Sequence, residues 1–149
     1  MTKEELGAFA RDVMGGADMV VLAANGPDGH PLQRALFNLR DERRFPSLAA
    51  YQRDKGLSVY LGTNTSSVKV REIGGDPRVS VYYMIPGEFK GLCLCGRALP
   101  DPAARDALWV EGWEMYYPKG RGDPDYTMLR IDPVRARGWT SMSGFDIEL

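Results

Sequence analysis

The 149-residue chain has little of what marks several classes of protein. It has no apolar run near the roughly 20 residues that a membrane span requires, so no membrane partner is expected. Its formal net charge is only −1, and its basic residues are mixed with acidic ones, which argues against nucleic acid as a partner. The amino terminus is charged and amphipathic, without the apolar core of a secretory signal. These features predict a soluble, cytoplasmic protein.

Metal ligands and nucleophiles are also scarce. The chain has two cysteines, Cys93 and Cys95, and one histidine, His30, whereas a structural zinc site takes about four such ligands. Two cysteines two residues apart in a strand share one face without normal disulfide geometry, so buried free thiols are expected. His30 lacks a partner nucleophile and is expected at the surface. Asp123 and Asp125 lack the rest of a calcium loop and are expected in a solvated turn, so no metal site is predicted.

What the chain does contain is a series of apolar runs separated by turn residues. Leu6, Phe9, Ala10 and Val13 have helical spacing, and alternating apolar residues on both sides of the turn at 25–29 indicate a hairpin. The expected elements are a helix at 6–16, a hairpin at 18–39, a short helix near Pro46, a strand at 57–63, a short helix at 68–75, a hairpin at 78–99, a helix at 101–116, and short strands at 126–132 and 136–142.

This order of elements predicts one domain over residues 1–149. Strands that follow one another in hairpins form antiparallel sheets, and helices placed between them give an α+β class rather than a doubly wound parallel sheet. Closure into a small barrel would also remove the exposed edges of such a sheet. The expected fold is therefore α+β and mainly antiparallel β, with helices at the periphery.

The segment 61–75 carries an unusual concentration of hydroxyl groups and a lysine between a strand and a helix. If the strand ends near Thr63 and the helix begins near Ser67, unpaired N–H groups and the positive end of the helix dipole face one point. Hydroxyls of Thr63, Ser66 and Ser67 can donate to phosphate oxygens, and Lys69 adds a positive charge. The alternative is that a serine simply caps the helix while Lys69 is solvated. The glycine spacing of a Walker loop is missing.

The same stretch resembles a known family. "TNTSSVKVREIGGDPRVSVYY" is similar to the flavin-phosphate segment of the pyridoxamine 5′-phosphate oxidase-like, FMN-binding split-barrel proteins of the general stress protein 26 type. "LQRALFNL", "CGRALP" and "ALWVEGWEMYYPKGRGDPDYTMLRIDPVRARGW" extend the resemblance from about Val20 to Trp139. It implies a split β-barrel with peripheral helices, FMN as cofactor, and an oxidoreductase reaction on a small molecule that the sequence does not identify.

The resemblance also implies roles for individual residues. Some would flank the flavin, one would reach it from a strand end, some would hold its phosphate, and one would lie near the ring or a subunit seam. The residues that would flank the flavin are Arg34, Ala35, Leu36 and Phe37, and Thr63 would reach it from the strand end. Ser67, the backbone N–H of Val68, and Lys69 would hold the phosphate. Trp139 would lie near the ring or the subunit seam.

This chain departs from the oxidase at three places. Val68 stands where the oxidase has one of the two basic residues that bind the flavin phosphate. Gly91 stands where the oxidase has a glutamine that contacts the flavin ring. No histidine follows His30, so the oxidase's terminal Arg-x-His substrate motif is missing and pyridoxamine phosphate oxidation is not expected. The alternatives are a non-catalytic flavin-binding or stress-related module, or a split barrel that uses the deazaflavin F420 or no cofactor. Haem ligation has poor support because only His30 is available.

The resemblance further implies a homodimer with FMN sites at the subunit seam. The aromatic group Trp109, Trp113, Tyr116 and Tyr117 has the composition of an interface centre. Two alternatives are that these rings fill the core of one chain or that they line a ligand pocket.

Overall fold

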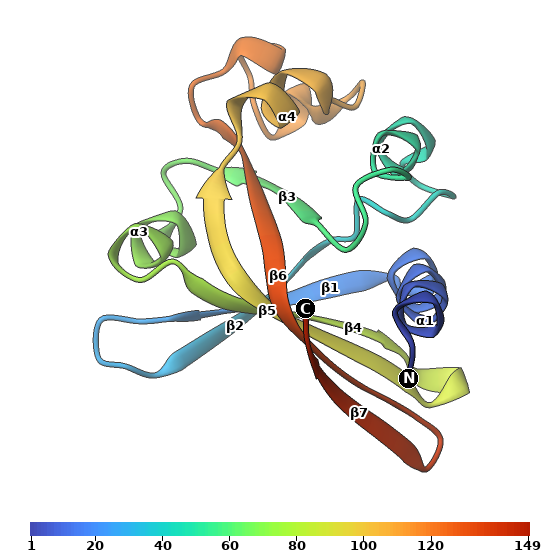
Figure 1. The fold of residues 1–149 in the computed structure, drawn as a ribbon. Helices are drawn as coiled ribbons and strands as arrows, with labels where there is room; N and C mark the ends of the chain where they lie inside the picture. Colours follow the sequence, from blue (N-terminus) through green and yellow to red (C-terminus); the bar gives the residue numbers. More distant parts are fainter.

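The computed structural model describes residues 1–149 as one curled antiparallel sheet with helices around it (Figure 1). The strand order is β2-β1-β4-β5-β6-β3, and β7 pairs with β6. This confirms the expected α+β, mainly antiparallel class. In chain order the helices and strands are α1 (Lys3–Gly16), β1 (Met19–Asn25), β2 (Pro31–Phe37), α2 (Pro46–Tyr51), β3 (Val59–Asn64), α3 (Val68–Gly75), β4 (Arg78–Ile85), β5 (Lys90–Pro100), α4 (Pro102–Ala107), β6 (Tyr126–Thr140) and β7 (Ser143–Glu148), with short 3-10 turns η1 (Pro86–Glu88), η2 (Trp113–Met115) and η3 (Gly120–Gly122).

Helix α1 shows why the predicted apolar spacing forms a helix. Thr2 and Glu5 form a capping box, in which the Thr2 side chain accepts from the Glu5 N–H and the Glu5 carboxylate accepts from the Thr2 N–H. Such caps satisfy N–H groups that the first turn leaves unpaired. Leu6, Ala10 and Val13 are buried against the sheet. None of the helices is both long enough and apolar enough to cross a membrane.

The carboxyl-terminal third differs from the prediction in two ways. The expected helix over 101–116 ends at Ala107, because Leu108 is extended and Gly112 takes a left-handed conformation with φ 97°. The two short strands expected at 126–132 and 136–142 are one continuous strand, β6. Pro133 is accommodated there because the register with β5 shifts between Cys95 and Gly96, and such bulges tolerate a residue that lacks an N–H. Strand β7 was not predicted.

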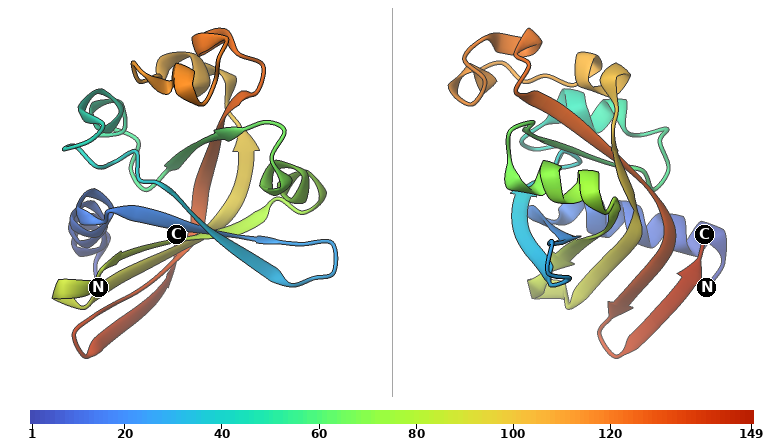
Figure 2. Two further views of the ribbon diagram at one scale, coloured as in Figure 1. Left: turned by 180° about the vertical axis from the view of Figure 1, so that it is seen from behind. Right: turned by 90° about the vertical axis from the view of Figure 1, so that its left-hand side faces the viewer.

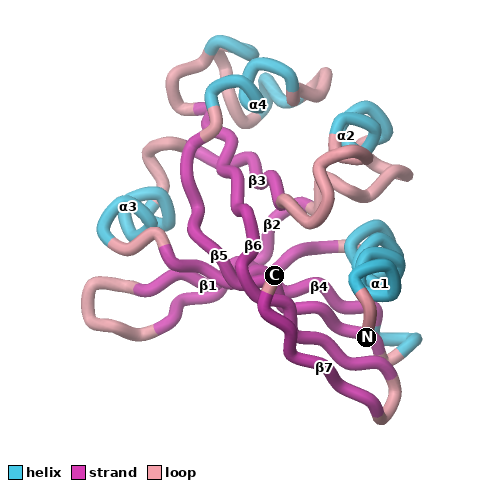
Figure 3. Tube along the Cα trace, in the orientation of Figure 1, coloured by secondary structure: helices cyan, strands magenta, loops and turns pink.

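Two buried clusters hold the elements together. The larger one lies between α1 and the concave side of the sheet, and it includes Leu22, Val81 and Leu94. The smaller one joins α2, α4 and η2 to β3 and β6, with Tyr60 and Tyr126 among its members. Figure 2 shows the corresponding arrangement from two further directions, with α1 along one side of the sheet and α4 at the far end of β6. Figure 3 shows α2, α3 and α4 around the strands and α1 beside β1 and β4.

The other side of the sheet has no helix over it. Alternate residues point there, and lateral pairing places Val21 beside Tyr82, Tyr82 beside Cys93, and Cys93 beside Arg137. We call this surface the open face. Cys93 and Cys95 share it as predicted, but both thiols are free and only half-buried, because no element covers them. The expectation of buried thiols was therefore wrong.

Candidate functional site

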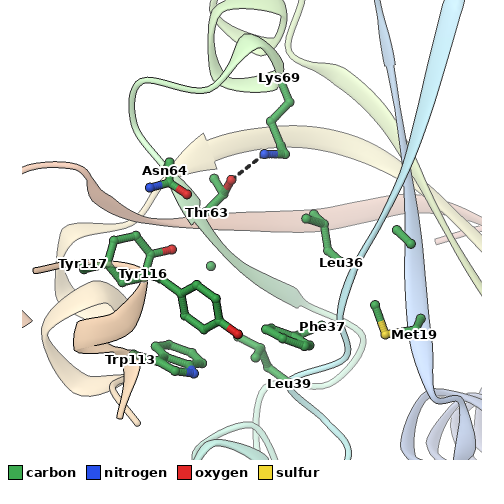
Figure 4. A pocket seen from close by; sticks show the side chains of 12 residues that line it. Met19, Leu36, Phe37, Leu39, Thr63, Asn64, Lys69, Trp113, Tyr116 and Tyr117 are labelled. Atoms are coloured by element: carbon green, nitrogen blue, oxygen red, sulfur yellow. Dashed lines mark hydrogen bonds between the residues drawn. The ribbon is translucent and has the colours of Figure 1, made fainter. Parts of the chain in front are cut away.

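A cavity of about 230 Å³ opens where β2, β3, α3 and η2 meet (Figure 4). Leu36 and Phe37 reach it from β2, Thr63 from the end of β3, and Lys69 from α3. Trp113, Tyr116 and Tyr117 form the wall opposite. We call this cavity the β2–β3–α3 pocket.

The turn between β3 and α3 is held by Pro124 and Asp125 of a distant loop, and the Thr65 hydroxyl donates to the Pro124 carbonyl at 3.0 Å. Asp125 accepts hydrogen bonds from the Ser66 N–H at 2.8 Å and from the Asn64 side chain at 2.7 Å. Thr65 donates its N–H to the Asp125 carbonyl at 2.6 Å. The Asn64 and Ser66 contacts hold the pKa of Asp125 below its usual value. Asp125 is therefore a structural anchor rather than a solvated turn residue. Asp123 is buried, whereas Asp125 is half-buried, and Asp123 accepts hydrogen bonds from the Lys119 and Asp125 N–H groups.

Lys69 lines the pocket, whereas the neighbouring Ser67 is not among the lining residues. Ser67 occupies the N-cap position of α3, but its hydroxyl makes no capping bond and is buried without a hydrogen-bond partner. Lys69 donates to the Thr63 hydroxyl at 2.7 Å, and burial, followed by the nearby Arg34 charge, lowers the pKa of its ammonium. A side-chain cap by Ser67 is therefore absent, and Lys69 is half-buried and hydrogen-bonded rather than fully solvated.

Arg34 lies beside the pocket, and its guanidinium already has partners within the chain. Its guanidinium forms a 2.6 Å ion pair with Glu72 of α3, whose side chain is 3% exposed. Another of its nitrogens donates to the Leu32 carbonyl at 3.0 Å. The ion pair ties β2 to α3 and so fixes the distance between the two walls. Arg34 is thus a neighbour of the pocket and not part of its lining.

Of the other residues implied by the resemblance, five line the pocket and Val68 does not. Ala35, Leu36, Phe37, Thr63 and Lys69 line the pocket together. The Val68 side chain is 57% exposed at the start of α3.

Trp139 lies elsewhere, on β6. It donates its indole N–H to the Tyr82 hydroxyl at 3.0 Å on the open face. Gly91 pairs with Trp139 across the strands, and a Cβ there would come within 2.7 Å of the indole nitrogen. A glutamine at position 91 would therefore have to displace this indole, which gives a physical reason for the glycine.

The four residues of the aromatic group, Trp109, Trp113, Tyr116 and Tyr117, differ in burial and in whether they line the pocket. Trp113 and Tyr117 are 8% and 6% exposed and belong to the smaller core cluster, so most of their surface is already covered within the single chain. Their place at an interface centre stays a prediction. They also contribute to the pocket wall. Tyr116 is 46% exposed and its ring lies 6.3 Å from that of Phe37. Trp109 packs on the ring of Trp113 outside the pocket. The pocket and own-core interpretations are thus both correct for Trp113 and Tyr117.

Four lining residues were missed: Met19, Leu39, Gly62 and Asn64. Gly62 and Asn64 flank Thr63 on β3, so their place at the strand end was available from the sequence. Met19 pairs with Phe37 in the first hairpin and follows from its register. His30, in contrast, is 77% exposed on the hairpin turn, as predicted.

Residues 40–148 match the family described as pyridoxamine 5′-phosphate oxidase like. The chain belongs to this family. No curated protein matches the chain. Among solved structures, a Clostridium acetobutylicum protein related to general stress protein 26 of B. subtilis is 25% identical, with a TM-score of 0.78 over 99% of this chain and 97% of that one. The fold is accordingly a split barrel of the pyridoxamine 5′-phosphate oxidase type.

Two more distant structures share the fold and differ in their ligands. An FMN-binding, pyridoxamine 5′-phosphate oxidase-related protein of Nostoc punctiforme is 15% identical, with a TM-score of 0.63 over 97% of this chain and 88% of that chain. A haem-binding protein of Mycobacterium smegmatis is also 15% identical, with a TM-score of 0.68 over 99% of this chain and 60% of that chain. The fold therefore does not by itself define a cofactor.

Proposed function

We propose that the chain is an FMN-binding flavoprotein that acts as an oxidoreductase on a small molecule. The observation that carries the proposal is the presence, at the start of α3, of a buried Ser67 hydroxyl without a hydrogen-bond partner and a Lys69 ammonium that forms no ion pair. A phosphate group would satisfy both, since it accepts hydrogen bonds and carries negative charge. The backbone N–H of Val68 is placed to contribute at the same helix end. The donor set therefore fits the phosphate of FMN.

The rest of the pocket suits a flat aromatic ring system. Leu36 and Phe37 supply an apolar wall from β2, and Tyr116 an aromatic one from the opposite side. Bound FMN would supply the electron transfer, and the chain would bind, orient and shield it. The pocket holds no pair of side chains arranged as general acid and base, so we assign no catalytic residue.

The volume of the pocket supports a dimeric site. At about 230 Å³ it is smaller than the roughly 300–1,000 Å³ typical of sites that enclose a ligand. Met19 and Phe37 are exposed at its rim and lie on the same side of the sheet as Val21. We propose that the open face pairs with a second copy of the chain, which completes each FMN site at the seam. Twofold symmetry is the commonest arrangement of soluble homo-oligomers.

The test compares FMN with riboflavin, which lacks the phosphate. Lys69→Ala should weaken FMN by about ten- to a hundredfold, because a charge-assisted contact is worth on the order of 1.5–3 kcal/mol. Riboflavin affinity should change little. Arg71→Ala, an exposed charge removal on the same helix, is the matched control. Equal losses for both ligands would refute the phosphate assignment, as would a loss caused by the control.

The absorption spectrum of the purified protein separates the other candidates. Flavin bands that bleach on adding a reduced nicotinamide cofactor support the oxidoreductase. Flavin bands that no reductant or substrate changes support a non-catalytic flavin-binding module. A haem spectrum would overturn the proposal, and the only histidine, His30, lies on the exposed hairpin turn, away from the pocket.

A further inference from the structure

A second and larger cavity lies on the other side of the molecule. Its volume is about 370 Å³ and it runs between α1, the segment that follows α2, and β7. In Figure 1, α2 lies above α1 on the same side of the sheet, and the carboxyl terminus lies close by. We call this cavity the arginine groove, because Arg11, Arg40 and Arg53 all line it. None of its lining residues belongs to the β2–β3–α3 pocket.

Arg40 is the central feature of the groove. One nitrogen of its guanidinium donates to the carbonyls of Gly56 and Ser58, both at 2.8 Å. Its Nε atom is buried and has no hydrogen-bond partner. Burial lowers the pKa of Arg40, and the ionisable neighbours that oppose this shift are Tyr83 and Tyr60, with no carboxylate among them. A half-buried guanidinium without a counter-ion is costly to the fold.

Two further arginines stand at the rim. Arg11 on α1 and Arg53 after α2 are both exposed, and they line, together with Arg40, an adjoining cavity as well. Of the three, only Arg53 forms an ion pair, with Glu42 at 2.6 Å. Guanidinium groups match carboxylate and phosphate oxygens in paired hydrogen bonds, and several of them converging favour an oxyanion.

Apolar residues line another part of the groove, which Lys3 and Glu148 also border. Leu6 is 4% exposed, and Leu57 and Ile147 pack against the main core cluster beside it. A cavity with an apolar end and a few converging polar groups is the usual form of a small-molecule site, and its volume lies within the usual range. A ligand with an apolar body and one anionic head matches the arginines and the apolar residues, provided that its head lies on the arginines and away from the Glu148 carboxylate.

We propose that the arginine groove binds a small organic oxyanion, whose phosphate or carboxylate head contacts Arg11, Arg40 and Arg53 while its apolar body packs on Leu6 and Leu57. The site is separate from the proposed FMN site, so either assignment can fail without the other. A purely structural role for Arg40, as the fastener of the segment before β3, is the alternative. It predicts no ligand and no part for Arg11.

The test is isothermal titration calorimetry with phenyl phosphate and with benzoate. The Lys69→Ala background is used so that the FMN phosphate site does not contribute. We expect saturable binding of at least one probe at one per chain, and the tighter of the two identifies the head group. Adding Arg11→Ala should weaken it by about tenfold or more. Arg97→Ala, an exposed arginine on β5 outside the groove, should leave it unchanged.

The contrary results are equally definite. No saturable binding of either probe would overturn the proposal, and so would equal weakening by Arg11→Ala and Arg97→Ala. Arg40→Met keeps the aliphatic stem and removes the charge. A folded Arg40→Met protein, verified by its circular dichroism, that still binds with full affinity would also contradict it. In the Lys69-containing chain, FMN affinity should be the same with and without Arg11→Ala.

Discussion

The two sides of the sheet are built from the same strands but differ in what covers them. Leu22, Val81 and Leu94 face α1 and are completely buried. Their immediate neighbours Val21 and Tyr82 face outward and remain half-buried, with no helix over them. Because successive side chains of a strand point to opposite faces, one strand contributes residues to both the covered side and the open face. The covered side stabilises the single chain, whereas the open face, which reaches the rim of the β2–β3–α3 pocket, is the surface that we propose for association.

The largest effect is expected on the covered side. Leu94→Ala removes a fully buried side chain and should lower the free energy of unfolding by about 2–5 kcal/mol, through lost burial and the cavity left behind. Urea denaturation of the variant gives this value directly. A matching truncation on the open face, Val21→Ala, should cost a dilute single chain about 1 kcal/mol or less. Similar losses for the two variants would remove the distinction between the sides.

A charge on the open face tests association instead of folding. Val21→Asp should weaken the dimer at least about hundredfold, or about 3 kcal/mol, because two carboxylates would be desolvated at the seam. Sedimentation velocity measures the change. Met142→Asp, at a fully exposed position in the turn before β7, is the control. A Val21→Asp protein that remains as dimeric as the control would place the interface elsewhere.

Local patterns predicted much of the fold and long-range contacts decided the rest. Helix α1 and the two hairpins β1–β2 and β4–β5 follow from apolar periodicity and turn residues. The expected helix at 101–116 failed because Gly112 adopts positive φ and the Leu108 carbonyl accepts from the Tyr126 hydroxyl, a contact with a distant strand. Strand β6 runs through Pro133 only because β5 shifts register opposite it. Alternation of Phe145 and Ile147 was the available signal for β7.

The candidate site was foreseeable in outline for similar reasons. Thr63, Ser67 and Lys69 lie within one strand-turn-helix unit, so their proximity depends only on local structure. Asp125 anchors that unit from a distant part of the chain. Neither the pattern around Ser66 nor the pattern around Asp125 predicts this contact. The resemblance also grouped Trp139 with the flavin residues, and in the single chain it is turned toward Tyr82 on the open face. Whether it approaches a flavin across a seam stays a prediction.

We propose that the open face and the pocket together form one FMN site per chain in a dimer. Sedimentation of the FMN-loaded protein, followed by both protein and flavin absorbance over a dilution series, tests it most directly. We expect flavin to sediment only with a species of twice the chain mass, at one FMN per chain, and the Val21→Asp monomer to carry none. A folded monomer that retains FMN with undiminished affinity would contradict it.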